Sequence, residues 1–324
     1  MAGETFLAGF QALATVWDTN GTPTELGTLG GTFSFAQAIN NSGQVASRAT
    51  LANGQTRATV WDADCTPTNL GTLGGISSIA QAINNSGQVA GRASLANNER
   101  RATVWDSNGT PTNLGTLGGT FSAAVAINDS GQVAGEATAS PANGGQLRAT
   151  RWDTDGNPTD LGALGGEFST ARAINDSGQV AGNARPATGG LRAIVWDADG
   201  TPTNLGTLGS STSSQAWAIN DLGFVVGDSG EAFFWSEDLG MISLFDSLSP
   251  EDQAEWQFLN VVFDINELGQ IVGSGTNAAG QGEAFILTPI FGPDIIPEPS
   301  TYAALFGVLA LGLAVRRRRR QVTA

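Results

Sequence analysis

Two acidic turns carry oxygen atoms at a spacing that could bind calcium. Asp106 and Asn108 lie two residues apart, as do Asp153 and Asp155, and a Gly follows each pair. Carboxylate and amide oxygens suit a hard cation such as Ca²⁺. The turns lack the third acidic position and the later bidentate Glu of a calcium loop, and hairpin turns use the same residue types for their backbone geometry. We therefore expect structural turns, with calcium as the weaker hypothesis and no other cofactor.

Aromatic side chains are the second candidate chemistry, because an indole can stack on a sugar ring. Six tryptophans recur at nearly regular intervals and are expected to be core anchors: Trp17, Trp61, Trp105, Trp152, Trp196 and Trp235. Trp217 and Trp256 fall outside this period. They are the better candidates for exposed ligand platforms.

Paired carboxylates could cleave glycosidic bonds. Most acidic residues lie in repeated turns, whereas a catalytic pair should break the repeat. Asp228, Glu231, Glu237 and Asp238 lie where the repeat has diverged. A glycosidase or lyase is therefore an alternative, but we favour a non-enzymatic protein and assign no catalytic residue.

The composition excludes several kinds of site. The 324 residues contain no His, and all 15 basic residues are Arg. A His general base, a His metal ligand, a Schiff-base lysine and a P-loop lysine are therefore excluded. The segment before Ser300 holds 10 Arg and all 30 acidic residues, so its charge is 10 − 30 = −20. So acidic a body should be repelled by nucleic acid, and we expect no nucleic-acid partner.

An internal repeat organises the chain. The Asn of Ala-Ile-Asn recurs at spacings of 44, 44, 47, 45 and 46 residues: Asn40, Asn84, Asn128, Asn175, Asn220 and Asn266. Within one unit, apolar runs at 121–128, 132–137, 148–153 and 158–164 are separated by turn residues, which is typical of four β-strands.

Four strands in about 44 residues match a propeller blade. We predict an all-β propeller of about six four-stranded blades, with seven blades as the alternative count and a β-solenoid as the alternative fold. One short helix is expected near Ser249-Pro250, where an N-cap precedes a Pro. The Ile before each repeated Asn should be buried: Ile39, Ile83, Ile127, Ile174, Ile219 and Ile265.

The chain begins in the middle of a repeat. Met1 aligns with Val89, and no basic, apolar leader precedes the first strand. We therefore expect that upstream sequence with a signal peptide belongs to this protein. The propeller domain is assigned to residues 1–291 and a linker to 292–299.

Residues 300–324 are expected to form a membrane-spanning sorting signal. Pro297, Glu298 and Pro299 precede an uncharged 14-residue segment, Tyr302 to Val315, and a run of five arginines, Arg316, Arg317, Arg318, Arg319 and Arg320. As a helix the segment would be about 21 Å long, short for a bilayer core of about 30 Å. Arginines at its end favour the cytoplasmic side.

This order of motif, span and basic run resembles the PEP-CTERM sorting signal. The resemblance implies that an exosortase-type enzyme processes the chain near Pro297-Glu298-Pro299. It also implies export in a Gram-negative bacterium, an inner-membrane intermediate, and a mature form at the cell surface or outside the cell.

The repeats are similar to the HAF family of extracellular repeat proteins. The shared features are Ala-Ile-Asn-x-x-Gly-x-Val, the Ala-x-x-Trp strand and Leu-Gly-x-Leu-Gly, over about residues 1–288. The His of the family's name motif is replaced here, for example by Arg148 or Glu231. The resemblance implies an extracellular matrix or interaction role, which we connect with exopolysaccharide. A carbohydrate-binding module is the alternative.

Overall fold

The computed structural model describes residues 2–7, 11–290 and 312–315. Within these ranges the chain is almost entirely β-structure, in seven consecutive sheets that we call blades 1 to 7. Six blades have four strands, and blade 1 has three. In every blade the strands follow one another across the sheet in chain order.

Blade 1 contains β1 (Ala2–Leu7), β2 (Gln11–Trp17) and β3 (Pro23–Glu25), and blade 2 contains β4 (Gly30–Ile39), β5 (Val45–Leu51), β6 (Thr56–Trp61) and β7 (Pro67–Asn69). Blade 3 contains β8 (Gly74–Ile83), β9 (Val89–Leu95), β10 (Arg100–Trp105) and β11 (Pro111–Asn113). Blade 4 contains β12 (Gly118–Ile127), β13 (Val133–Ala139), β14 (Leu147–Trp152) and β15 (Pro158–Asp160).

Blade 5 contains β16 (Gly165–Ile174), β17 (Val180–Pro186), β18 (Arg192–Trp196) and β19 (Pro202–Asn204). Blade 6 contains β20 (Gln215–Ile219), β21 (Val225–Asp228), β22 (Ala232–Ser236) and β23 (Gly240–Ser243). Blade 7 contains β24 (Trp256–Ile265), β25 (Ile271–Asn277), β26 (Gly282–Ile290) and β27 (Gly312–Val315).

These blades are those of a β-propeller. Antiparallel pairing of consecutive strands, as in β8–β9–β10–β11, distinguishes them from a β-solenoid, whose coils stack as parallel strands. The structure has seven blades, the alternative count, rather than six. The reason is that β1–β3 and β24–β27 form separate sheets, so the two ends of the chain do not share one blade.

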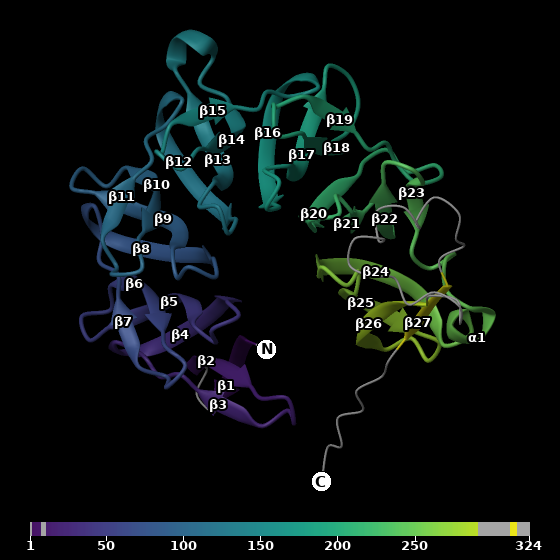
Figure 1. Ribbon diagram of the computed structural model, residues 1–324, viewed down its shortest axis with the longest axis horizontal. Coiled ribbons are helices and arrows are strands. Elements are labelled where there is room, and N and C mark those ends of the chain that lie inside the picture. The colour runs from purple at the N-terminus through teal and green to yellow at the C-terminus, as the bar shows by residue number, and fades with distance from the viewer. Residues whose placement is uncertain (1, 8–10, 291–311, 316–324) are drawn as a thin grey trace. The chain divides into compact units, whose positions relative to one another are not determined.

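The chain divides into two compact units. The first contains residues 1–162 and 167–176, and the second contains residues 163–166 and 177–324. Figure 1 follows the chain through the first unit from β1 to β15 and through the second from β17 to β26.

Apolar contacts between successive blades form the core of the first unit. Trp105 of β10 is fully buried and shares one cluster with Leu70, which follows β7 of the preceding blade. Trp152 and Leu114 make the same pairing one blade later. Burial of such side chains contributes about 1.5–3 kcal/mol each. The regular tryptophans at 61, 105, 152 and 196 are fully buried, as predicted, whereas Trp17 and Trp235 are half-buried.

The repeated isoleucines follow the prediction in most blades. Buried members are Ile83, Ile174, Ile219 and Ile265, and Ile127 packs half-buried on its core cluster. Ile39 is 41% exposed, so the expectation fails for that residue.

Within each unit, the repeated Asn links successive blades. The Asn84 side chain is 3% exposed, and its Nδ2 donates to the backbone carbonyl of Asn128, 3.1 Å away in the next blade. The same bond runs from Asn40 to Asn84, from Asn128 to Asn175 and, in the second unit, from Asn220 to Asn266. We call this series the Asn ladder.

The same side chains also shape their own turns. The Oδ1 of Asn84 accepts the N–H of Gln88 at 2.9 Å, and its Nδ2 also donates to Oε1 of Gln88 at 2.8 Å. One buried amide therefore closes the hairpin within a blade and contacts the following blade.

The predicted helix is present as α1 (Pro250–Gln253). Ser249 is its N-cap, and the Ser249 hydroxyl accepts the N–H of Asp252 at 3.1 Å. A 3₁₀ turn, η1 (Pro141–Asn143), lies between β13 and β14.

The prediction of a helix over Tyr302 to Val315 is wrong for its last four residues. Gly312–Val315 form β27, which pairs antiparallel with β26 through Leu287↔Val315 to Ile290↔Gly312. An apolar segment can satisfy its backbone at an open sheet edge as well as in a helix. The remainder of that segment lies outside the described residues. Among the helices in the described ranges, none has the length and apolarity needed to cross a bilayer.

The Asn ladder predicts that substitutions of two asparagines in blade 3 affect the stability of the protein very differently. Replacing Asn84 by Ala leaves the Asn128 carbonyl without that donor and opens the hairpin, so we expect a loss of roughly 1–3 kcal/mol in the free energy of unfolding. Asn108 is exposed in the other turn of the same blade and is the control. Urea denaturation of N84A and N108A measures both. Equal midpoints would contradict a stabilising role for the ladder.

Candidate ligand-binding cleft

The acidic turns use their leading carboxylate to close a hairpin. Oδ1 of Asp106 accepts the N–H groups of Asn108 and Thr110 at 2.9 and 2.8 Å. Oδ1 of Asp153 accepts those of Asp155 and Asn157 at 3.0 and 2.8 Å. These bonds favour the structural interpretation of both turns. Among the residues that the structure describes, no group of three or more Cys, Asp or Glu side chains could hold a metal ion.

These hydrogen bonds favour the ionised carboxylates. The Thr110 N–H is the main cause that lowers the pKa of Asp106, and the side chain and N–H of Asn157 lower the pKa of Asp153. The pKa of Asp18 is lowered in the same way by the N–H of Thr22.

The prediction that Trp256 is an exposed platform is wrong. Trp256 is 4% exposed and packs edge-to-face on Phe285, with ring centroids 5.9 Å apart, in the core of blades 6 and 7. It is the first residue of β24, and every third residue of that strand is buried, so the indole points to the core. Trp217 is half-buried against the same core, and its Nε1 donates to Oδ2 of Asp228 at 2.7 Å.

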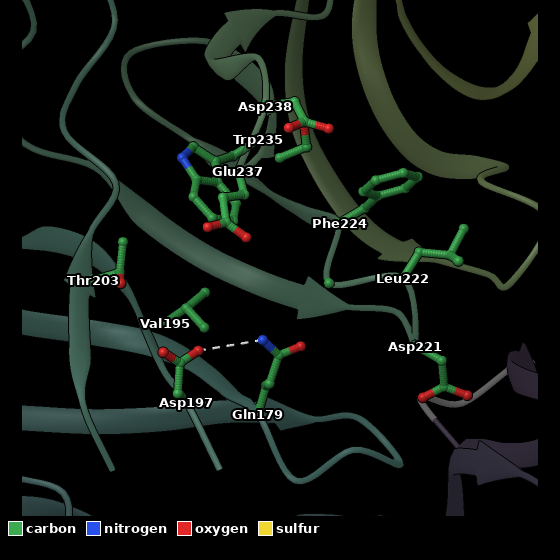
Figure 2. Close-up of a pocket in the computed structure, with 12 residues that line it drawn as sticks. Gln179, Val195, Asp197, Thr203, Asp221, Leu222, Phe224, Trp235, Glu237 and Asp238 are labelled. Atoms are coloured by element: carbon green, nitrogen blue, oxygen red, sulfur yellow. Dashed lines mark hydrogen bonds between the residues drawn. The ribbon is translucent and has the colours of Figure 1, made fainter. Parts of the chain in front are cut away.

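A cleft of about 400 Å³ lies between blades 5 and 6 in the second unit. Its lining comes from the residue before β17, the end of β18, β19, and the β20–β21 and β22–β23 turns (Figure 2). Trp235 supplies half-buried aromatic surface, and Phe224 borders the cleft from the core, 8% exposed. The cleft is also lined by four acidic side chains and no basic one, the acids being Asp197, Asp221, Glu237 and Asp238.

The cleft lies where two repeated residues have changed. The position after the turn glycine is Gln in the other blades that have it, namely Gln44, Gln88, Gln132, Gln179 and Gln270, but Phe224 occupies it in blade 6. The residue after the periodic Trp is Asp in blades 1 to 5, but Ser236 in blade 6. Trp235 is half-buried here, whereas Trp105, Trp152 and Trp196 are fully buried.

The change at Ser236 alters the acidic turn. Glu237 and Asp238 form the exposed tip of the β22–β23 hairpin, and the structure shows no hydrogen bond to either carboxylate. Their counterparts in blade 3 are Ser107 and Asn108, which follow the turn-closing Asp106. Opposite them, Oδ1 of Asp197 accepts Nε2 of Gln179 at 3.3 Å (Figure 2).

Sequence reasoning found only part of this site. Glu237 and Asp238 were candidates because their region breaks the repeat, and both line the cleft, whereas Asp228 and Glu231 do not. Trp235 was assigned to the core because its position is periodic. Phe224 stands where the other blades have Gln, and this change in the sequence could have indicated that the surroundings of Trp235 differ from those of the other periodic tryptophans.

The predicted sorting residues, Pro297 to Pro299 and Arg316 to Arg320, lie outside the described residues. Residues 296–320 match the PEP-CTERM protein-sorting motif. The motif indicates an exported, sorted protein of a Gram-negative bacterium that is anchored transiently in the membrane.

Comparison with curated proteins gives no match to the chain. Among solved structures, the acylaminoacyl peptidase of Pyrococcus horikoshii in its orthorhombic crystal form is 12% identical with a TM-score of 0.50, over 85% of this chain and 46% of that one. TolB from Acinetobacter baumannii is 16% identical with a TM-score of 0.48, over 72% of this chain and 59% of that one. At such identities the peptidase likeness supports the propeller fold alone.

The turn carboxylates predict a loss of stability in acid. Their pKa values are lower in the folded chain, so their contribution is full above the unfolded value of about 3.9 and is lost as pH falls through the folded value. We expect the Tm to fall below about pH 4. Asn accepts the same N–H bonds without titrating, so the variant Asp18→Asn, Asp106→Asn, Asp153→Asn should show a shallower fall.

Circular dichroism melts from acid to neutral pH measure this effect. The control variant Glu25→Gln, Glu167→Gln, Glu251→Gln removes the same charge from three exposed positions. If both triple variants flatten the Tm profile equally, net charge and not the turn bonds determines it.

Proposed function

We propose that the protein is a non-enzymatic, exported propeller that associates with the producer's exopolysaccharide at the cell surface or outside the cell. The PEP-CTERM motif at residues 296–320 is the observation that carries the proposal. An exosortase-type enzyme is the processing partner, with residues 300–324 as the transient membrane anchor. The similarity of the repeats to HAF extracellular repeat proteins agrees with this location.

The propeller body supports an interaction role. Its repeated side chains are used for packing and turn closure, as Trp105, Asn84 and Asp106 illustrate. The sequence contains no His, so a Ser-His-Asp hydrolase site of its own is excluded. The cleft beside Trp235 instead combines aromatic surface with hydrogen-bond acceptors, which suits binding of a hydroxyl-rich ligand.

Removal of the C-terminal segment gives the mature form a charge near −20, from 10 Arg and 30 acidic residues. The proposal therefore favours neutral or cationic polysaccharides, because an anionic polymer would be repelled.

Processing can be tested by mass spectrometry of the exported protein. We expect a C-terminus near Pro297-Glu298-Pro299 that lacks Arg316 to Arg320. Changing these three residues to Ala should leave the full-length chain in the membrane fraction. An exported form that still carries the five arginines would contradict the sorting mechanism.

Association with exopolysaccharide can be tested by co-sedimentation of the exported protein with polymer from the producing cells. We expect the protein in the pellet and no new reducing ends in the polymer. A protein that stays in the supernatant at every polymer concentration would contradict the proposed role. Release of reducing ends would favour the glycosidase or lyase alternative.

A further inference from the structure

The cleft of blade 6 has the features of a ligand site. Its volume of about 400 Å³ lies in the range of small-molecule pockets, about 300–1,000 Å³. It lies at a blade that departs from the repeat at Phe224 and Ser236. The departure provides a half-buried indole, Trp235, in place of the fully buried one of blades 2 to 5.

The polar groups of the cleft determine the kind of ligand. Ionised carboxylates only accept hydrogen bonds, and the lining includes four of them but no Arg. They come from three turns, with Asp197 after β18, Asp221 after β20, and Glu237 and Asp238 after β22. A ligand group that meets these carboxylates must therefore donate hydrogen bonds, and a positive charge on it is favoured electrostatically.

The aromatic side chain narrows the class further. In Figure 2 Trp235 and Glu237 are drawn on one side of the cleft, and Val195, Asp197 and Gln179 on the other. An indole face attracts both the apolar face of a sugar ring and a cation. A protonated amine on a sugar ring combines the two properties with hydroxyl donors for the carboxylates.

We propose that the cleft binds a protonated amino-sugar unit of a polysaccharide, with Trp235 as the stacking surface and Glu237 and Asp238 as the principal acceptors. The assignment rests on the proposed association with exopolysaccharide and names the part of the polymer that is recognised. Gln179 holds the Asp197 carboxylate on the opposite wall, at 3.3 Å. The exposed hairpin tip gives a chain of linked sugars room to extend out of the cleft.

Calorimetric titration of the full exported chain tests the assignment, with a β-1,4-linked glucosamine oligosaccharide as the probe and its fully N-acetylated form for comparison. We expect the free-amine oligosaccharide to bind. The acetylated one should bind at least about tenfold more weakly, because acetylation removes the positive charge. Raising the pH above the pKa of the amine should weaken binding in the same way. Equal affinities for the two oligosaccharides would overturn the proposal.

Variants at the cleft separate a specific site from general charge. Glu237→Gln with Asp238→Asn should weaken binding about tenfold or more, since it removes two charged acceptors. The control, Glu25→Gln with Glu251→Gln, removes the same charge elsewhere and should bind like the unmodified protein. Equal weakening by both variants would show that only net charge matters and would overturn the site.

Trp235→Leu provides the second test of the same site. We expect it to weaken binding of the free-amine oligosaccharide while the circular dichroism spectrum is retained. Unchanged binding would overturn the role of the indole. If Trp235→Leu unfolds the protein, the variant Glu237→Gln with Asp238→Asn tests the site instead, because both of its residues are exposed.

The co-sedimentation test distinguishes the two proposals. If the protein sediments with exopolysaccharide but binds neither oligosaccharide, the amino-sugar assignment fails and the proposed function stands. If it binds the free-amine oligosaccharide but not the producer's polymer, the cleft assignment stands and the proposed function fails.

Discussion

The Asn ladder is the constraint on which the blades depend. Each buried Asn closes its own hairpin and donates to a backbone carbonyl of the following blade, as Asn84 does to Asn128 at 3.1 Å. A second bond runs alongside it, from the N–H of Asn85 to Oδ1 of Asp129 at 2.9 Å. Because a buried amide without partners is costly, the ladder fixes where each turn lies relative to its neighbour. The Trp–Leu contacts can then pack in a constant register.

The candidate cleft follows from this arrangement. In blade 6, Asn220 keeps its bond to Asn266, so the turn stays in place while residues around it change. Phe224 follows that turn, and Ser236 replaces the Asp that closes the facing hairpin. The backbone framework of the repeat therefore persists although its side chains have changed. Phe224 packs into the core, and the Ser236 hydroxyl accepts the N–H of Leu239 at 3.2 Å, while Glu237 and Asp238 lie exposed at the hairpin tip. Such positions can recognise a ligand without loss of the blade.

Prediction from sequence succeeded where local chemistry determines structure. The strands of one sequence repeat and the short helix after Ser249 were predicted because turn residues, capping and apolar runs are local signals. It failed where a partner distant in sequence decides. Trp256 is buried because Phe285 packs against it, and Val315 lies in a strand because β26 offers an edge. The cleft could not be located from sequence because Asp197 and Glu237 come from different blades and line one cleft only in the folded chain.

The Asn ladder also has a direction, since every rung donates from one blade to the next and none is reciprocal. Within the ladder, each Asn therefore contributes one donor to the next blade, whatever the length of the other loops. The rung from Asn128 to Asn175 spans 47 residues and that from Asn84 to Asn128 spans 44, yet the bonds are 3.0 and 3.1 Å long. A gene encoding such a chain can gain a blade by unequal recombination between copies, because the new unit arrives with both halves of its connection.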